Sequence, residues 1–199
     1  MFGNVKPSGK LPLSFPHRNE DNPAFLNYRS EKGRTIYGEG VYVGYRFYEK
    51  CQRNVAFPFG FGLSYTTFKY SSLSLQEFDD TLAVALDVHN TGDVDGAEVV
   101  QVYVAQHSPS IWRPLKELKG FRKVFIPAGK SERVTLHISK KYATSFWDEY
   151  KHAWVQENGR YTVLVGDSSA HTPLSATFNV EQTAWWNGLR SCQTKTQCR

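Results

Sequence analysis

Asp93 and Asp95, followed directly by Gly96, form the most metal-like cluster of the sequence. Oxygen-rich turns bind calcium, but the spacing of an EF-hand would place Thr91 at the first ligand position and Val102 where a bidentate glutamate belongs. The alternative is a polar turn whose aspartates accept hydrogen bonds from nearby backbone amides. The 6 histidines never show the spacing of a zinc hydrolase. We therefore expect neither a metal nor another cofactor.

Two glycine-containing motifs come close to sites for phosphate or nucleophilic chemistry. Gly129-Lys130-Ser131 ends like a phosphate-binding loop, but Val124 occupies the position of the required upstream glycine. We predict a hairpin turn between two strands there instead. The segment Gly62 to Thr66 lacks the closing glycine of a nucleophile elbow. Neither motif supports nucleotide binding or serine hydrolysis.

Hydrolysis of a glycoside needs two carboxylates that face each other across the sugar, one of them kept protonated. The early part of the chain offers Glu20, Asp21, Glu31 and Glu39, but nothing in their spacing pairs them. Solvated carboxylates at the surface are the alternative for all four. We therefore assign no catalytic residue in this chain.

Tryptophan rings can stack on the apolar faces of sugars while their N–H groups reach hydroxyls. Trp112 lies in a predicted loop, and Trp185 and Trp186 follow the last predicted strand, so these three are candidates for a surface or interface role. Trp147 and Trp154 stand among alternating residues, where burial in a core is expected.

The composition of the 199 residues, with 40% hydrophobic and 15% aromatic residues, is that of a folded globular protein. The net charge of +5 is scattered, which argues against a nucleic-acid surface. No apolar run has the length of a membrane span or the character of a signal peptide, and localisation stays open. Cys192 and Cys198 either close a small loop or remain free thiols on the final segment.

Short alternating runs from about residue 66 onward are typical of an antiparallel sandwich. Leu82 to Val88 forms one half-buried strand, and the turn residues of Asn90 to Gly96 predict a hairpin with a strand through Val100 to Val104. The first 62 residues are rich in proline and glycine and should need a partner to pack against. Further strands are expected over residues 68–75, 118–126, 133–138, 145–154, 161–165 and 174–180.

Six segments carry recognisable motifs in a fixed order: Pro7 to Pro16, Tyr37 to Tyr48, Phe57 to Phe68, Asn90 to Val104, Lys116 to Phe121 and Gly159 to Gly166. In order and spacing they resemble the carboxy-terminal part of glycoside hydrolase family 3 β-glucosidases, and the resemblance covers about residues 3 to 189. One departure is Phe61, where many members carry histidine.

The resemblance implies a mainly β fold, an immunoglobulin- or fibronectin type III-like sandwich preceded by the loop-rich end of an α/β domain. We expect residues 1–62 to be that end with its linker, 63–183 the sandwich, and 184–199 a disordered tail. Family members carry the nucleophilic aspartate and the acid/base glutamate upstream, and no position here matches either motif.

The first hypothesis is that the chain is a carboxy-terminal fragment of a β-glucosidase, inactive alone, whose partners are the missing upstream domains. In the full enzyme the reaction would be retaining hydrolysis of terminal non-reducing β-D-glucosyl residues. The alternative is a stand-alone sandwich that binds polysaccharide or a protein through Trp112, Trp185 and Trp186. Glucan or oligosaccharide is a candidate ligand in both, and neither nucleic acid nor membrane is expected.

Overall fold

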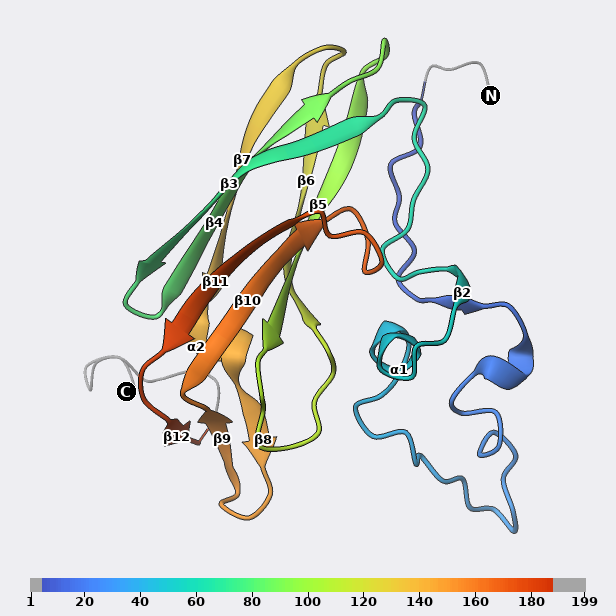
Figure 1. Ribbon diagram of the computed structural model, residues 1–199. Helices are drawn as coiled ribbons and strands as arrows, with labels where there is room; N and C mark the ends of the chain where they lie inside the picture. Colours follow the sequence, from blue (N-terminus) through green and yellow to red (C-terminus); the bar gives the residue numbers. More distant parts are fainter. Residues whose placement is uncertain (1–4, 188–199) are drawn as a thin grey trace, which may run out of the picture.

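A computed structural model describes residues 5–187, in which antiparallel strands are the main regular structure (Figure 1). In chain order the elements are β1 (Phe15–Pro16), a 3-10 turn (Asn19–Asp21), α1 (Tyr45–Lys50), β2 (Val55–Phe57), β3 (Phe68–Phe78), β4 (Thr81–Asn90), β5 (Gly96–Gln106), β6 (Glu117–Ile126), β7 (Ser131–Ser139), α2 (Lys140–Thr144), β8 (Phe146–Asp148), β9 (Ala153–Gln156), β10 (Gly159–Gly166), β11 (Leu174–Val180) and β12 (Ala184–Trp186).

Two main sheets pack face to face as a sandwich. One has the strand order β3-β4-β7 and the other β11-β10-β5-β6. The alternation of β4 explains the core, because Leu82, Val84, Leu86 and Val88 project from one face and are fully buried. Alternating valines of β5 and β10 meet them from the opposite sheet. The predicted fold class is confirmed.

The predicted hairpin between the strands at 82–88 and 100–104 is wrong, because β4 and β5 belong to different sheets. The segment between them crosses over at one end of the sandwich, where Asn90 is completely buried. Its Nδ2 donates hydrogen bonds of 2.9 Å to the carbonyl oxygens of Val94 and Ile126. Its Oδ1 accepts a bond of 3.2 Å from the amide of Gly92. The amide of Asn90 therefore secures a crossover between sheets.

The turn at Gly129-Lys130-Ser131 is likewise not a hairpin turn. It joins β6 to β7, and β6 pairs with β5 whereas β7 pairs with β4. Alternation shows which face of a strand is buried but not which neighbour the strand pairs with. Both errors have this cause.

The predicted strand at 145–154 is interrupted. Ser139 caps the short helix α2 by accepting a bond from the amide of Tyr142, and Asp148 stabilises the turn between β8 and β9 through the amides of Tyr150 and Lys151. β8 and β9 form a small sheet of order β12-β9-β8 at one end of the sandwich (Figure 1). The expectation of a disordered tail over 184–199 is wrong for its first residues, because Ala184–Trp186 form β12, which pairs with β9.

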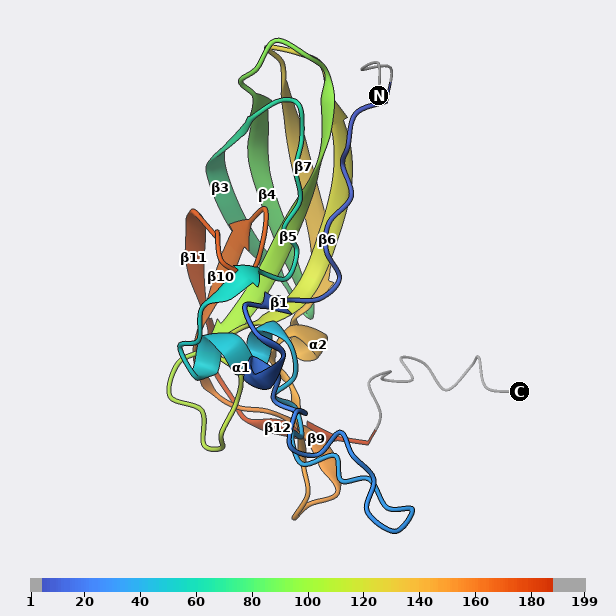
Figure 2. The ribbon, with the colours of Figure 1, turned by 90° about the vertical axis from the view of Figure 1, so that its right-hand side faces the viewer.

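Residues 5–62, here called the first segment, run along one side of the sandwich, with α1 beside β5 and β6 (Figure 2). β1 and β2 pair with each other only, through Phe15 opposite Phe57. Among the described residues, no helix combines the length and apolar character needed to cross a membrane.

Candidate functional site

Helix α1 brings two tyrosines of the first segment against the sandwich. It follows Gly44, whose φ of 57° lies in the left-handed region that glycine adopts without strain. Tyr45 and Tyr48, three residues apart, share one helix face and are both buried. The Tyr45 hydroxyl accepts a hydrogen bond of 2.9 Å from the amide of Leu118, and its ring meets that of Tyr103 edge-on at 5.9 Å.

Gln101 of β5 points away from the sandwich core and is nevertheless buried, because the first segment covers it. Its Nε2 donates to the carbonyl oxygen of Gly60 over 3.1 Å and also to that of Asp167. Its Oε1 accepts a bond of 2.6 Å from the Tyr103 hydroxyl. This amide therefore joins the first segment to β5 and to the loop that follows β10.

Glu117 at the start of β6 is the centre of a cluster of charges. Its carboxylate lies 3.0 Å from Arg113, 3.1 Å from Lys119 and 4.0 Å from Arg46 of α1. Burial opposes the ionisation of Glu117, but Lys119 and Arg113 outweigh it and hold the pKa of the carboxyl below its ordinary value. Burial also lowers the pKa of the Lys119 ammonium, which Glu117 partly offsets. The surrounding cations therefore favour the ionised form of Glu117 at the boundary between the first segment and the sandwich.

Two further ion pairs cross the same boundary. Lys10 lies 2.7 Å from Glu98 of β5, and both side chains are largely buried. Lys116 lies 3.0 Å from Glu49 of α1. Partial burial reduces the screening of such pairs by water and salt, so they constrain geometry more than exposed pairs do.

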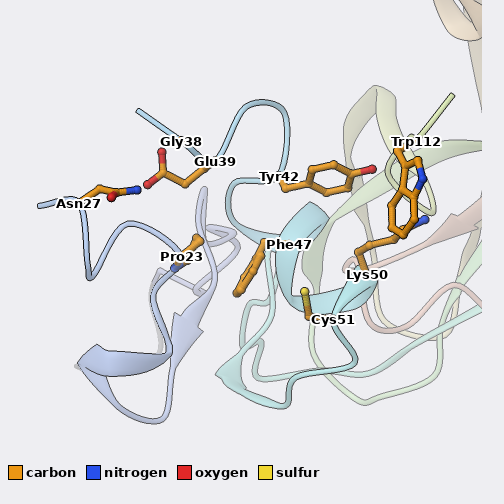
Figure 3. A pocket seen from close by; sticks show the side chains of 9 residues that line it. All are labelled: Pro23, Asn27, Gly38, Glu39, Tyr42, Phe47, Lys50, Cys51 and Trp112. Atoms are coloured by element: carbon orange, nitrogen blue, oxygen red, sulfur yellow. The ribbon is translucent and has the colours of Figure 1, made fainter. Parts of the chain in front are cut away.

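A pocket lies between the first segment and the loop that carries Trp112 (Figure 3). Its volume is about 420 Å³. The Tyr42 hydroxyl points toward Trp112, while the Glu39 carboxylate and Asn27 lie at the other end (Figure 3). The Nζ of Lys50 lies 4.9 Å from the centroid of the Trp112 ring. The lining residues are Pro23, Asn27, Gly38, Glu39, Tyr42, Phe47, Lys50, Cys51 and Trp112.

The lining of this pocket is suited to binding more than to acid/base chemistry. Glu39 is the one carboxylate among the lining residues in the described part of the chain, whereas glycoside hydrolysis uses two. Glu39 Oε1 and the Tyr42 hydroxyl are buried and have no hydrogen-bond partner among residues 5–187. Burial raises the pKa of Tyr42, to which Cys51 adds a smaller effect.

The other early carboxylates lie apart from this pocket. Asp21 lies 3.4 Å from Arg18 and 3.6 Å from Arg53, and Glu31 is part of a backbone bridge with Arg34. Glu20 is exposed in the 3-10 turn.

The three predicted surface tryptophans fall into two places. Trp112 is 80% exposed at the rim of the pocket. Trp185 and Trp186 lie in β12, under the Nζ atoms of Lys151 at 3.6 Å and Lys141 at 4.2 Å from the ring centroids. The structure therefore does not gather the three into one site.

Trp147 and Trp154 were expected in the core, and for Trp147 this is wrong, since 44% of it is exposed. Trp154 is partly buried beside it. They lie on a short hairpin at the margin of the sandwich, and the core is filled by other strands.

The metal-like turn behaves as the polar-turn reading predicts, because Asp95 Oδ1 accepts a bond of 2.9 Å from the amide of Ala128. Residues 5–187 bring together no group of three or more His, Cys, Asp or Glu side chains able to hold a metal. Cys192 and Cys198 lie outside the described residues.

The residues that join the first segment to the sandwich carry no distinctive signal in the sequence. Gln101 alternates with the inward-facing valines of β5, a pattern that indicates a solvent-facing side chain, whereas in the structure the first segment covers it. Arg113 follows a tryptophan in a loop and is buried, where it donates to the carbonyl oxygen of Thr144 over 3.0 Å.

Two family models match the chain. The glycosyl hydrolase family 3 C-terminal domain matches residues 1–45, and the fibronectin type III-like domain matches residues 98–169. A probable β-glucosidase I of Aspergillus fumigatus is 49% identical over 95% of the chain, which covers 23% of that protein. A putative β-glucosidase of Schizosaccharomyces pombe is 47% identical, again over 95% of the chain and 23% of its own length.

Solved structures agree with these relatives. The β-glucosidase of Kluyveromyces marxianus in complex with glucose superposes with a TM-score of 0.92 at 48% identity, over 94% of this chain and 23% of that one. β-Glucosidase 3B of Thermotoga neapolitana in complex with α-D-glucose gives 0.88 at 38% identity, over 94% and 26%. The chain thus spans about a quarter of the length of the proteins it matches. The predicted resemblance is confirmed: the chain matches the carboxy-terminal portion of glycoside hydrolase family 3 β-glucosidases, in which a family 3 C-terminal segment is followed by a fibronectin type III-like domain.

Proposed function

We propose that this chain serves as the carboxy-terminal part of a β-glucosidase, in which residues 1–62 complete an α/β domain and residues 63–183 brace it. The observation that carries the proposal is the two-sidedness of the first segment. One side is held to the sandwich by buried polar contacts, and the other exposes apolar side chains to solvent.

The exposed side of the first segment contains an apolar groove next to β1 and β2. Its volume is about 590 Å³, and its lining residues are Pro7, Gly9, Lys10, Leu11, Phe15, Phe57, Phe61, Gly62 and Leu63. A sheet of only two strands is marginal in water, and exposed aromatic patches mark interfaces. The groove and the open edges of β1 and β2 therefore form the surface on which the remainder of the α/β domain would pack.

The sandwich supports this segment from the other side. The contacts of Gln101 with Gly60, of Tyr45 with Leu118 and of Lys10 with Glu98 bury polar groups in pairs. Such contacts tolerate little displacement, because an unpaired buried group costs roughly 1–3 kcal/mol. The sandwich would thus fix the position of the last strands and loops of the α/β domain.

The reaction of the whole enzyme would be retaining hydrolysis of terminal non-reducing β-D-glucosyl residues through a covalent glycosyl-enzyme. The chain has no match to the nucleophile or acid/base motifs of the family, so it would bind no transition state by itself. Its partners would be the upstream domains and, through them, glucosides or glucans.

Trp112 would contribute to the interface with the upstream domains. The Nζ of Lys50 in α1 donates to the carbonyl oxygen of Arg113 over 3.3 Å and lies over the Trp112 ring. These contacts hold the indole next to α1. Its 80% exposed surface is free for a contact with upstream domains.

The test is the hydrolysis of a chromogenic β-glucoside by the purified chain of residues 1–199. We expect no turnover above that of a heat-denatured sample. Measurable turnover that disappears when Glu39 is changed to glutamine would overturn the proposal, because a carboxylate of this chain would then be catalytic.

A further inference from the structure

Three tryptophans form a row across the small sheet at one end of the sandwich. In the register of its strands, Trp154 of β9 lies opposite Trp186 of β12 and opposite Trp147 of β8. Residues directly opposite each other in antiparallel strands project from the same face. Neighbouring strands are about 4.8 Å apart, so this tryptophan row extends about 10 Å across the sheet.

The tryptophan row lies on the face of the small sheet opposite Val155, and its exposure is greatest at Trp147. On the opposite face of the same sheet, Val155 lies between Phe146 and Trp185 in the register and is buried. On the row side, Trp147 is 44% exposed and meets Trp154 edge-on, with ring centroids 5.8 Å apart and planes at 76°. Trp147 and Trp154 are therefore oriented by one another, and solvent reaches Trp147.

Polar groups flank the tryptophan row. Gln156 follows Trp154 by two residues and so lies on the same face, opposite the small side chain of Ala184. The Nζ of Lys141 lies 4.2 Å from the Trp186 ring centroid. An ammonium and an amide thus lie beside the tryptophan row.

We propose that the tryptophan row binds a chain of β-linked glucosyl residues. The apolar C–H faces of pyranose rings would stack on the indoles, and their hydroxyls would bond to Gln156 and Lys141. A protein partner would need roughly 800 Å² on each side, whereas the row is one side chain wide. The choice of glucan as the occupant rests on the proposed function.

The location of the row suits a role within a larger enzyme. The small sheet is separated from β1 and β2, where the remainder of the α/β domain would pack, in both views (Figures 1 and 2). The row would therefore stay accessible in the assembled enzyme and would hold a polymer near the enzyme without contributing to bond cleavage.

The experiment is a calorimetric titration of residues 1–199 with cellohexaose, together with a pull-down on insoluble cellulose. We expect saturable binding, a dissociation constant at least fivefold higher for Trp147→Ala, and a smaller increase for Trp147→Phe, which keeps an aromatic face. Trp185→Ala is the matched control, because Trp185 is also 44% exposed but projects from the other face. Its affinity should stay within twofold of the original.

Absence of saturable binding by the unchanged chain would overturn this inference, as would an equal loss in Trp147→Ala and Trp185→Ala. Thermal unfolding of each variant shows whether a loss of binding reflects a loss of fold, and Trp147→Phe then decides. The assay involves no hydrolysis, so its failure would leave the proposed function standing. Turnover by the chain alone would in turn leave the binding result unchanged.

Discussion

The side-chain amide of Gln101 in β5 donates a hydrogen bond of 3.1 Å to the carbonyl oxygen of Gly60 in the first segment. The two residues are 41 positions apart and both belong to the boundary between the segment and the sandwich. Gly60 has a φ of +79°, and a Cβ placed on it would lie 2.1 Å from Gln101 Oε1. The glycine is thus required by both its backbone conformation and its close approach to the amide.

Gly60→Ala should destabilise the chain by roughly 2–4 kcal/mol, through the cost of a left-handed alanine and the displacement of Gln101. Gly129→Ala is a matched control, because Gly129 has a φ of +66° but no atom within 4 Å of the added Cβ. It should cost only about 1–2 kcal/mol. Equal losses in urea unfolding would show that the contact with Gln101 is not tight.

Asn90→Ala should cost about 2–4 kcal/mol, since it leaves the carbonyl oxygens of Val94 and Ile126 without their donor at a buried crossover. Asn158→Ala, at an exposed asparagine that accepts from Thr183, should change stability by less than about 1 kcal/mol. The midpoint of urea unfolding, at an unchanged slope, measures both. A small effect at Asn90 would argue against its role in the crossover.

Stability should fall at acid pH through Glu117. The cations around it hold its folded pKa below the ordinary value of 4.5, so its contribution is complete above that pH and is lost as the pH falls through the folded pKa. Glu117→Gln should lower the melting temperature at neutral pH, and the difference from the unchanged chain should shrink below pH 4.5. The exposed Glu132 provides the control, Glu132→Gln, whose melting curve should change little. A difference that is constant with pH would contradict this assignment.

Residues 63–187 should unfold cooperatively without the first segment, because the core of the sandwich lies between β3-β4-β7 and β11-β10-β5-β6. We expect them to be less stable than the full chain by at least about 2 kcal/mol, since Tyr103 and Gln101 would lose their cover. Residues 1–62 alone should show no cooperative transition by circular dichroism. A sharp transition in that short piece would refute the division at residue 62.

Local patterns in the sequence predicted the strands well because each strand of the sandwich has one buried face. Leu82 to Val88 show this alternation, and all the predicted inward positions are buried. Strand pairing was not predictable in the same way. Asn90 to Gly96 has the composition of a hairpin turn, yet its asparagine is used to secure a crossover, and alternation is identical in both cases.

The contacts between the two parts of the chain were out of reach of sequence reasoning. Gln101 looks like a solvent-facing residue of a half-buried strand until Gly60 is placed against it. The tryptophan row was missed for a related reason, because the register of β12 on β9 brings Trp186 beside Trp154 across more than thirty residues. The sequence of one strand does not indicate which distant strand lies beside it.

The role proposed for this chain, as the carboxy-terminal structural part of a family 3 β-glucosidase, is tested most directly by the specific activity of a chimera. In this chimera, residues 1–199 replace the matching portion of the Kluyveromyces marxianus β-glucosidase. We predict that the Kluyveromyces marxianus enzyme truncated before this portion is inactive and that the chimera hydrolyses a chromogenic β-glucoside. Gly60→Ala should lower the specific activity of the chimera. A folded chimera as inactive as the truncated enzyme would contradict the account.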